Sequence, residues 1–254
     1  MQGILCSPIF SATGMASDMG ITEIRELTRK VDGLITDKEM ELLYTLAKNC
    51  RGGVIVEIGS WKGKSTICLA KGAKDGNGVK VYAIDPHTGS SEHKEGGKNI
   101  WTFEEFKKNI EDAEVSDIVV PIVKTSEEAA RDFKEPVALL FIDGAHEYEY
   151  VKLDYDLWFP KLAEHGIIAF HDTIGWLGPK QVVNDLVHKS KRIKSRGFID
   201  SIWFGEKVRQ NTLIDRIKNR YILLLGSIYE FAYARLHLPR PIKTIGKKVL
   251  RLVQ

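Results

Sequence analysis

Short runs of apolar residues alternate along the chain with longer stretches in which apolar residues recur every three or four positions. The runs predict strands and the periodic stretches predict helices. Val137-Ala138-Leu139-Leu140-Phe141-Ile142 is a continuous run, typical of a strand buried on both faces of a parallel sheet. Strands are predicted at 54–58, 80–84, 118–123, 137–142 and 167–171, and helices at 65–73, 102–113, 126–133 and 148–162. This alternation predicts an α/β fold, a Rossmann-like sheet with helices on both faces.

The pattern changes at both ends of this alternating region. Before it, helices are predicted at 21–30 and 36–48, the second with Thr36 as its N-cap. After it come a helix at 180–191 and two short strands at 193–199 and 202–206, close enough to form a hairpin. That hairpin would place an antiparallel strand at the edge of the sheet. Residues 1–20 are expected to form a loose cover, and the polar loop 86–99 is a candidate lid.

The strand at 54–58 passes into a helix through a glycine turn, Glu57-Ile58-Gly59-Ser60-Trp61-Lys62-Gly63-Lys64-Ser65. A strand, glycine turn and helix in this order are typical of nucleotide-type sites. Gly63-Lys64-Ser65 is like the end of a phosphate loop, but only three residues separate Gly59 from Gly63 where that loop needs four. In a dinucleotide fingerprint the second glycine would fall at Trp61, whose side chain blocks a pyrophosphate.

A ligand without phosphates at this turn, such as S-adenosylmethionine, tolerates Trp61. Its ribose hydroxyls need an acidic partner, and Asp85, at the end of the second predicted strand, offers acceptors for two hydroxyls. The alternatives are that Asp85-Pro86 only begins a turn, and that the chain is a P-loop-like nucleotide-binding protein.

Together these segments resemble class I S-adenosylmethionine-dependent methyltransferases, and within them the branch of cephalosporin-hydroxylase-like and macrocin-type O-methyltransferases. The resemblance covers about residues 50–205 and implies a seven-stranded sheet whose last hairpin is antiparallel. It rests on Glu57-Ile58-Gly59-Ser60 with Gly63 and Ser65, Ile84-Asp85-Pro86, Phe141-Ile142-Asp143-Gly144-Ala145-His146 with Tyr148, Asp154 with Trp158, and Gly166-Ile167-Ile168-Ala169-Phe170-His171-Asp172-Thr173.

The resemblance also implies a reaction, methyl transfer to a hydroxyl of a small molecule or glycan, of the sugar or secondary-metabolite type. Asp143, His146, His171 and Asp172 follow adjacent strands and should border one cleft. His146, with Asp143, is the candidate catalytic group that removes the hydroxyl proton. Metal-dependent relatives imply Mg²⁺ assistance, for which Asp143, Asp172 and His171 are the candidate ligands. The alternatives are a backbone contact for Asp143 and a satisfied buried histidine at 171.

The cofactor contacts implied by the resemblance come from the ends of several strands. Ser126, interpreted as the N-cap of its helix, is expected to contact the adenine. Trp101 and Trp176 would stack on the acceptor or pack in the core. The predicted cofactor-binding residues are Glu57, Gly59, Ser60, Trp61, Gly63, Ser65, Asp85, Ser126 and Asp143.

Charge is unevenly distributed along the 254 residues. The whole chain carries a net charge of +3, yet residues 207–254 hold 11 Lys and Arg against two acids. Within this tail, apolar residues recur at helical spacing from Leu213 to Phe231. We therefore expect a catalytic domain at 50–206, preceded by a cover and helices at 1–49 and followed by a basic amphipathic helical tail at 207–254.

The tail suggests how the protein associates with partners. A dimer contact or packing on its own domain is favoured, so we expect a homo-oligomer. The alternative is a peripheral membrane contact through 209–254, in the extreme case by a non-catalytic scaffold protein. Nucleic acid is not expected, because apolar residues dominate the segment.

Composition narrows the compartment. Three cysteines without zinc or disulfide spacing indicate reduced thiols and a cytoplasmic protein, and no signal peptide is recognised. The longest apolar run, 221–234, is shorter than the roughly 20 residues that span a bilayer.

Overall fold

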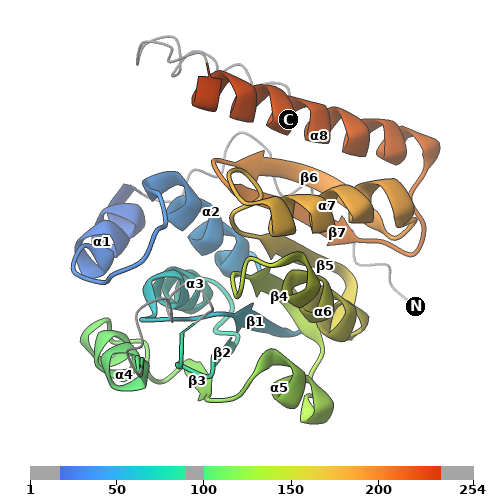
Figure 1. The fold of residues 1–254 in the computed structure, drawn as a ribbon. Coiled ribbons are helices and arrows are strands. Elements are labelled where there is room, and N and C mark those ends of the chain that lie inside the picture. Colours follow the sequence, from blue (N-terminus) through green and yellow to red (C-terminus); the bar gives the residue numbers. More distant parts are fainter. Residues whose placement is uncertain (1–17, 90–99, 236–254) are drawn as a thin grey trace.

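A seven-stranded sheet runs through the molecule in the order β3-β2-β1-β4-β5-β7-β6 (Figure 1). The structure, a computed structural model, describes residues 18–89 and 100–235. Strands β1 to β5 are parallel, and β7 lies antiparallel to both β5 and β6. The strands are β1 (Val54–Ile58), β2 (Val81–Ile84), β3 (Val119–Ile122), β4 (Val137–Ile142), β5 (Leu162–Phe170), β6 (Ile193–Ile199) and β7 (Ile202–Lys207). The predicted Rossmann-like sheet and its antiparallel edge hairpin are therefore confirmed.

Helices cover both faces of this sheet (Figure 1). One face carries α1 (Asp18–Thr28), α2 (Asp37–Lys48), α3 (Lys64–Asp75) and α4 (Phe103–Asp112). The other carries α5 (Ser126–Asp132), α6 (Tyr148–Trp158) and α7 (Leu177–Lys189). A short 3-10 helix, η2 (Phe159–Lys161), follows α6, and the long helix α8 (Leu213–Arg235) lies outside, along β6 and α7.

Alternation along the strands explains why the apolar runs are continuous. In β4, Leu139 and Phe141 point into the core beneath α2 and α3, whereas Leu140 and Ile142 point into the core beneath α6 and α7. Successive side chains of a strand point to opposite faces, so a strand with helices on both sides needs apolar residues at every position.

Some elements begin or end at other residues than predicted. Strand β5 begins at Leu162, not at 167, because η2 ends the preceding helix at Trp158 and returns the chain to the sheet early. Proline lacks an N–H and restricts the residue before it, so Pro160 accounts for that end. Helix α7 begins at Leu177, not at 180. Residues 1–17 of the predicted cover, 90–99 of the lid and 236–254 of the tail lie outside the described residues.

The N-terminal helix α2 is part of the core. Thr36 caps it as predicted: its hydroxyl accepts from the Glu39 N–H at 3.3 Å, and the Glu39 carboxylate accepts from the Thr36 N–H at 2.8 Å. Leu43 and Tyr44 are fully buried.

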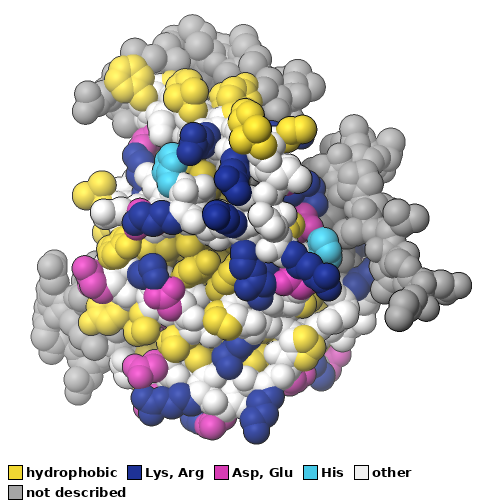
Figure 2. Space-filling model, turned by 90° about the vertical axis from the view of Figure 1, so that its right-hand side faces the viewer, with side chains coloured by type: hydrophobic (Ala, Val, Ile, Leu, Met, Phe, Trp, Pro, Cys, Tyr) yellow, Lys and Arg dark blue, Asp and Glu magenta, His cyan; other side chains and the backbone are white. Residues whose placement is uncertain are grey.

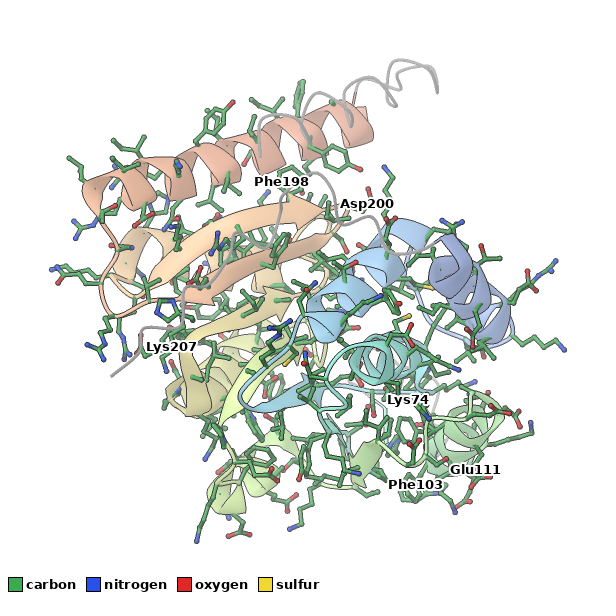
Figure 3. The ribbon with its side chains drawn as sticks, turned by 180° about the vertical axis from the view of Figure 1, so that it is seen from behind. Lys74, Phe103, Glu111, Phe198, Asp200 and Lys207 are labelled. Atoms are coloured by element: carbon green, nitrogen blue, oxygen red, sulfur yellow. The ribbon has the colours of Figure 1, made fainter. Side chains whose placement is uncertain are left out.

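Seen from behind (Figure 3), Phe198 of β6 lies beneath α8, with the Tyr229 ring 5.8 Å away.

Within the described residues, none of the helices combines the length and hydropathy needed to cross a membrane.

Candidate active site

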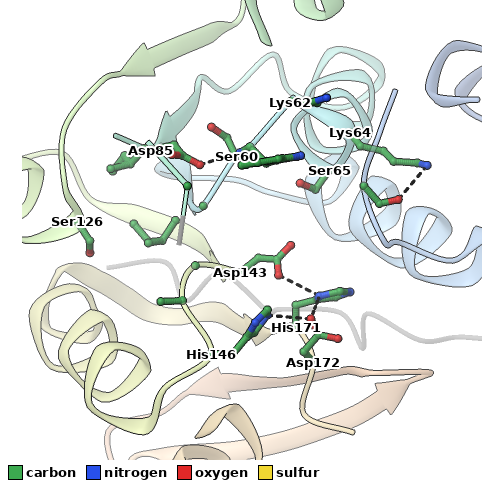
Figure 4. Close-up of a pocket in the computed structure, with 18 of the residues that line it drawn as sticks. Ser60, Lys62, Lys64, Ser65, Asp85, Ser126, Asp143, His146, His171 and Asp172 are labelled. Atoms are coloured by element: carbon green, nitrogen blue, oxygen red, sulfur yellow. Dashed lines mark hydrogen bonds and ion pairs between the residues drawn. The ribbon is translucent and has the colours of Figure 1, made fainter. Parts of the chain in front are cut away.

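A pocket of about 460 Å³ opens at the carboxyl ends of the parallel strands (Figure 4). Its size falls within the range of about 300–1,000 Å³ typical of small-molecule sites. Most of its wall is formed by the carboxyl ends of β1, β2, β4 and β5 and by the residues that follow them. Lining residues include Asp32–Ile35, Ile58–Lys62, Lys64, Ser65, Ile84–Pro86, Gly89, Thr125, Ser126, Asp143–His146, Tyr150, Asp154, His171 and Asp172.

The glycine turn after β1 is shaped by the neighbouring loop as much as by a ligand. Gly59 has a φ of +86°, and a Cβ there would lie 2.2 Å from the Asp143 carbonyl oxygen. Gly63, with a φ of +91°, passes close to the Phe106 ring. Trp61 also lies in the left-handed region, with a φ of +46°. The turn thus brings the end of β1 against the end of β4, and Gly59 and Trp61 border the pocket.

Asp85 connects this turn to the end of β2. One carboxylate oxygen accepts from the Trp61 N–H at 2.7 Å and the other from the His87 N–H at 2.6 Å. Each oxygen of a carboxylate has two acceptor sites, so both retain one for a further hydroxyl. The side chain lines the pocket and is largely buried, and its bond to the His87 N–H is that of an Asx turn. The ribose contact of Asp85 therefore stays a prediction.

The three predicted serines all line the pocket, but their hydrogen bonds differ. Ser60 and Ser65 line the pocket, and within the described part of the chain the buried Ser60 Oγ has no hydrogen-bond partner. A buried polar atom of this kind usually has a partner, so a ligand atom would complete it. Ser126 also lines the pocket and accepts from the Trp158 indole at 2.9 Å. The N-cap of α5 is Thr125, not Ser126 as predicted, because Thr125 forms the capping box with Glu128.

Glu57 is separated from the pocket. It is fully buried in β1, accepts from the Thr66 hydroxyl, and does not belong to the lining residues. Burial raises the pKa of its carboxyl to about 8. Its predicted cofactor contact therefore stays a prediction, whereas its link to the first turn of α3 is observed.

Two histidines and two aspartates meet at the other side of the pocket (Figure 4). His171 Nδ1 lies 2.9 Å from an Asp143 oxygen and 3.0 Å from Asp172 Oδ2. The same Asp172 oxygen lies 3.0 Å from His146 Nε2. The His146 ring stacks on Trp176 at a centroid distance of 4.4 Å. All four predicted residues are thus brought together.

The charges within this cluster are mutually dependent. Burial alone would lower the pKa of His171, but the carboxylates of Asp143, Asp172 and Glu39 outweigh it and hold that pKa well above the ordinary value. Burial would likewise raise the pKa of Asp172, and the two histidines reverse this and lower it. Burial keeps the pKa of Asp143 raised, against the pull of His171. The raised pKa of His171 favours its charged form, which lies between two acids.

One trio in the cluster has the geometry of a cation site. Oxygen or nitrogen atoms of Asp143, His146 and Asp172 all lie within 4.8 Å of one another. The predicted trio had His171 in place of His146. His171 in its charged form pairs electrostatically with the two carboxylates, whereas a metal ligand needs a free lone pair. Two carboxylates and one imidazole form a donor set that fits Mg²⁺ less well than Mn²⁺, Fe²⁺ or Zn²⁺.

Some neighbours of the site were not predicted. Glu39 of α2 is buried and lies 3.7 Å from His171 Nε2. Asp154 lines the pocket, and burial raises the pKa of its carboxyl to about 6. The spacing of Asp154 and Trp158, one helical turn apart, was the available signal for Asp154. No sequence signal pointed to Glu39, because it reaches the site only through the packing of α2.

Comparisons with known proteins concern the domain and the fold. Residues 56–173 match a family described as a methyltransferase domain. An uncharacterized protein of Sinorhizobium fredii, y4gI, is 31% identical over 121 residues, which are 47% of this chain and 13% of that protein. The chain thus spans only a small part of this curated relative.

Among solved structures, the O-methyltransferase NovP has a TM-score of 0.60 at 18% identity, over 74% of this chain and 88% of that one. TomG from Streptomyces achromogenes, an O-methyltransferase of tomaymycin synthesis in complex with SAM, has a TM-score of 0.55 at 15% identity, over 76% and 92%. Identities this low establish the fold alone. Residues 56–173 thus match a methyltransferase domain, and the chain has the fold of the O-methyltransferases NovP and TomG.

Proposed function

We propose that the protein is an S-adenosylmethionine-dependent O-methyltransferase acting on a hydroxyl of a small molecule or glycan. The observation that carries this proposal is one pocket with two chemically different sides. Asp85 and the unpartnered Ser60 hydroxyl lie on one side, and the His146–Asp172 pair lies on the other. When bound, S-adenosylmethionine supplies an electrophilic methyl group.

The first side suits the cofactor. Asp85 retains acceptor capacity for two ribose hydroxyls, and the turn from Gly59 to Gly63 brings backbone close to the pocket. Ser65 lies at the N-terminal end of α3, where helix dipoles favour a carboxylate. Ser126 borders the region expected to receive the adenine. NovP and TomG, which have this fold, carry the name O-methyltransferase, and TomG was solved with SAM.

The second side suits the acceptor hydroxyl. His146 Nε2 is held by Asp172, and stacking on Trp176 fixes the plane of the ring. An oriented imidazole is suited to remove the hydroxyl proton during transfer. Asp143 and the cation His171 surround the reacting atoms with fixed charges, which cost no reorganisation during the reaction.

The alternative for this second side of the pocket is that it binds a divalent cation. Asp143, His146 and Asp172 would hold it, and when bound it would lower the pKa of the acceptor hydroxyl. The two assignments compete for the same His146 nitrogen, because a nitrogen that ligates a metal cannot also accept a proton. Titration with Mn²⁺ of wild type and Asp143→Asn separates them. Binding that Asp143→Asn abolishes supports the metal; wild type without Mn²⁺ affinity leaves His146 as the base.

Cofactor binding tests the proposal directly. Isothermal titration should show S-adenosylhomocysteine binding to wild type and an affinity at least about tenfold weaker for Asp85→Ala, a loss of about 1.4 kcal/mol. The matched control Asp112→Ala removes an exposed acid from α4 and should bind as wild type. ATP binding that is lost in Lys64→Ala, with no affinity for S-adenosylhomocysteine, would instead establish the P-loop alternative.

A further inference from the structure

Helix α8 has two faces with opposite surroundings. On its inner face Asn219 and Ile222 are buried against the domain, and Asn219 accepts from the Ser195 N–H at 2.7 Å. On its outer face large apolar side chains are exposed, by 43% to 73%. They are Leu213, Ile214, Ile217, Tyr221, Leu224, Ile228 and Phe231. In Figure 2 hydrophobic side chains gather at the top of the molecule, where α8 lies in Figure 1.

The spacing of this outer face favours another helix as its partner. Ile214, Ile217, Tyr221, Leu224 and Ile228, which we call the outer stripe, are separated by three, four, three and four residues. That alternation repeats every seven residues and forms a straight seam, as at the core positions of a coiled coil. Lys218 and Arg220 are exposed on either side of the seam. The apolar strip is therefore narrow, whereas a helix lying in a bilayer buries a broad apolar face.

The distribution of charge identifies the orientation of that partner. Lys218 and Arg220 both flank the first half of the outer stripe, while Glu230 is the one charged residue between 221 and 234. A parallel copy of α8 would set the two basic residues against the same two residues of its partner. An antiparallel copy separates them, and places Arg220 on the same side of the seam as the uncharged Ser227 of the partner subunit.

We propose that the outer stripe is a dimer interface, in which α8 pairs antiparallel with α8 of a second copy of the chain. A two-fold axis then makes the contact self-complementary. Ile217 lies against Ile228 of the partner subunit, and Tyr221 against Leu224 of the partner subunit. Burying this stripe removes an exposed apolar patch of a kind that monomeric proteins rarely keep. The inference is independent of the methyl-transfer reaction, because α8 contributes no residue to the pocket.

The mass of the full-length protein in solution tests the interface. Light scattering should give twice the chain mass of 28.6 kDa for wild type and the single mass for Leu224→Glu. Leu153→Glu places the same charge on an exposed leucine of α6 and should remain dimeric. Thermal unfolding and S-adenosylhomocysteine affinity of each variant report separately on folding and on the pocket.

Cysteine cross-linking tests the orientation without adding charge. In a Cys6→Ser background the other native cysteines, Cys50 and Cys68, are buried. Under mild oxidation a mixture of Ile217→Cys and Ile228→Cys proteins should form a cross-linked heterodimer, and Ile217→Cys alone should form little. Efficient Ile217→Cys homodimers without the mixed product would overturn the antiparallel pairing. A monomeric wild type that floats with phosphatidylserine vesicles, with flotation lost in Leu224→Glu, would replace the dimer with a membrane contact.

Discussion

The carboxyl group of Glu57 makes stability depend on pH. Its pKa is about 8 in the folded protein because it is buried, against an ordinary value of 4.5. Between these values the folded state keeps a proton that the unfolded state loses, so the group increasingly destabilises the fold as pH rises from 4.5 to 8. Glu57→Gln removes this penalty. The unfolding free energy of Glu57→Gln minus that of wild type should therefore increase by up to about 1.4 kcal/mol for each pH unit between 4.5 and 8.

Urea denaturation at pH 5, 7 and 9 measures this difference. Glu127→Gln, at an exposed acid paired with Arg131, is the control and should shift stability little at any pH. A constant difference between Glu57→Gln and wild type across the three pH values would show that Glu57 is already charged in the folded protein.

Asp172 holds both histidines of the cluster, so its replacement separates their environments. Asp172 has a φ of +54°, which asparagine also tolerates, so Asp172→Asn removes charge with little change in backbone. The pKa of His171 should fall but stay above its ordinary value, because Asp143 and Glu39 remain beside it. Imidazole NMR titration in the absence of metal measures this. An unchanged His171 pKa would mean that Asp172 does not contribute to its charge.

The convergence of Asp143, His146, His171 and Asp172 was predictable, because adjacent parallel strands end at one edge of a sheet. The position of each imidazole was not. Whether His146 or His171 lies between two carboxylates depends on the left-handed backbone at Asp172 and on the packing of Trp176 against His146. Neither feature has a local sequence pattern.

At the scale of elements, the turn between β1 and α3 is the most constrained connection. A Cβ at Gly59 would overlap the Asp143 carbonyl at 2.2 Å. At Gly52, also in the left-handed region, such a Cβ would have no atom of residues 18–89 or 100–235 within 4 Å. Gly52→Ala should cost about 1–2 kcal/mol of unfolding free energy for its backbone alone. Gly59→Ala should cost a further 1–3 kcal/mol for the overlap. Equal losses in chemical denaturation would mean that the β1 and β4 ends separate readily.

Element types were predictable where period and capping agreed. β1 and β4 have the predicted bounds, because β4 is a continuous apolar run, β1 is apolar except for Glu57, and turn residues follow both. The start of β5 was not, since Leu162–Gly166 includes the polar residues Glu164 and His165 and has no strand pattern of its own. The segment follows a short 3-10 helix, and Leu162 pairs with Val137 of β4 before an irregularity in the register.

At the scale of the whole molecule, the seven-stranded sheet with its antiparallel edge hairpin followed from the order of elements and the family resemblance, but the docking of the terminal segments did not. Glu39 illustrates why. Its carboxylate accepts from the backbone and hydroxyl of Ser201, 162 residues away, and also faces His171. It joins α2, the β6–β7 turn and the active site. A contact between such distant segments depends on three surfaces fitting together, which one helix pattern does not encode.

Replacing Glu39 should therefore weaken the whole fold. Glu39 is 1% exposed, and breaking a buried charged pair from one side costs about 3–5 kcal/mol, so Glu39→Gln should lose about 3 kcal/mol of unfolding free energy at pH 7.

Burial would raise the pKa of Glu39, but His171 and the Thr36 and Ser201 donors lower it below 4.5. Its stabilisation is thus complete above pH 4.5 and is lost as pH falls through the lower, folded-state pKa. The gap between wild type and Glu39→Gln should narrow from pH 7 to pH 4 and below. Glu23→Gln replaces an exposed acid that pairs with the partly buried Lys71, and should cost less than about 1 kcal/mol. If chemical denaturation gave the two variants equal losses, Glu39 would be no more than a surface contact of α2.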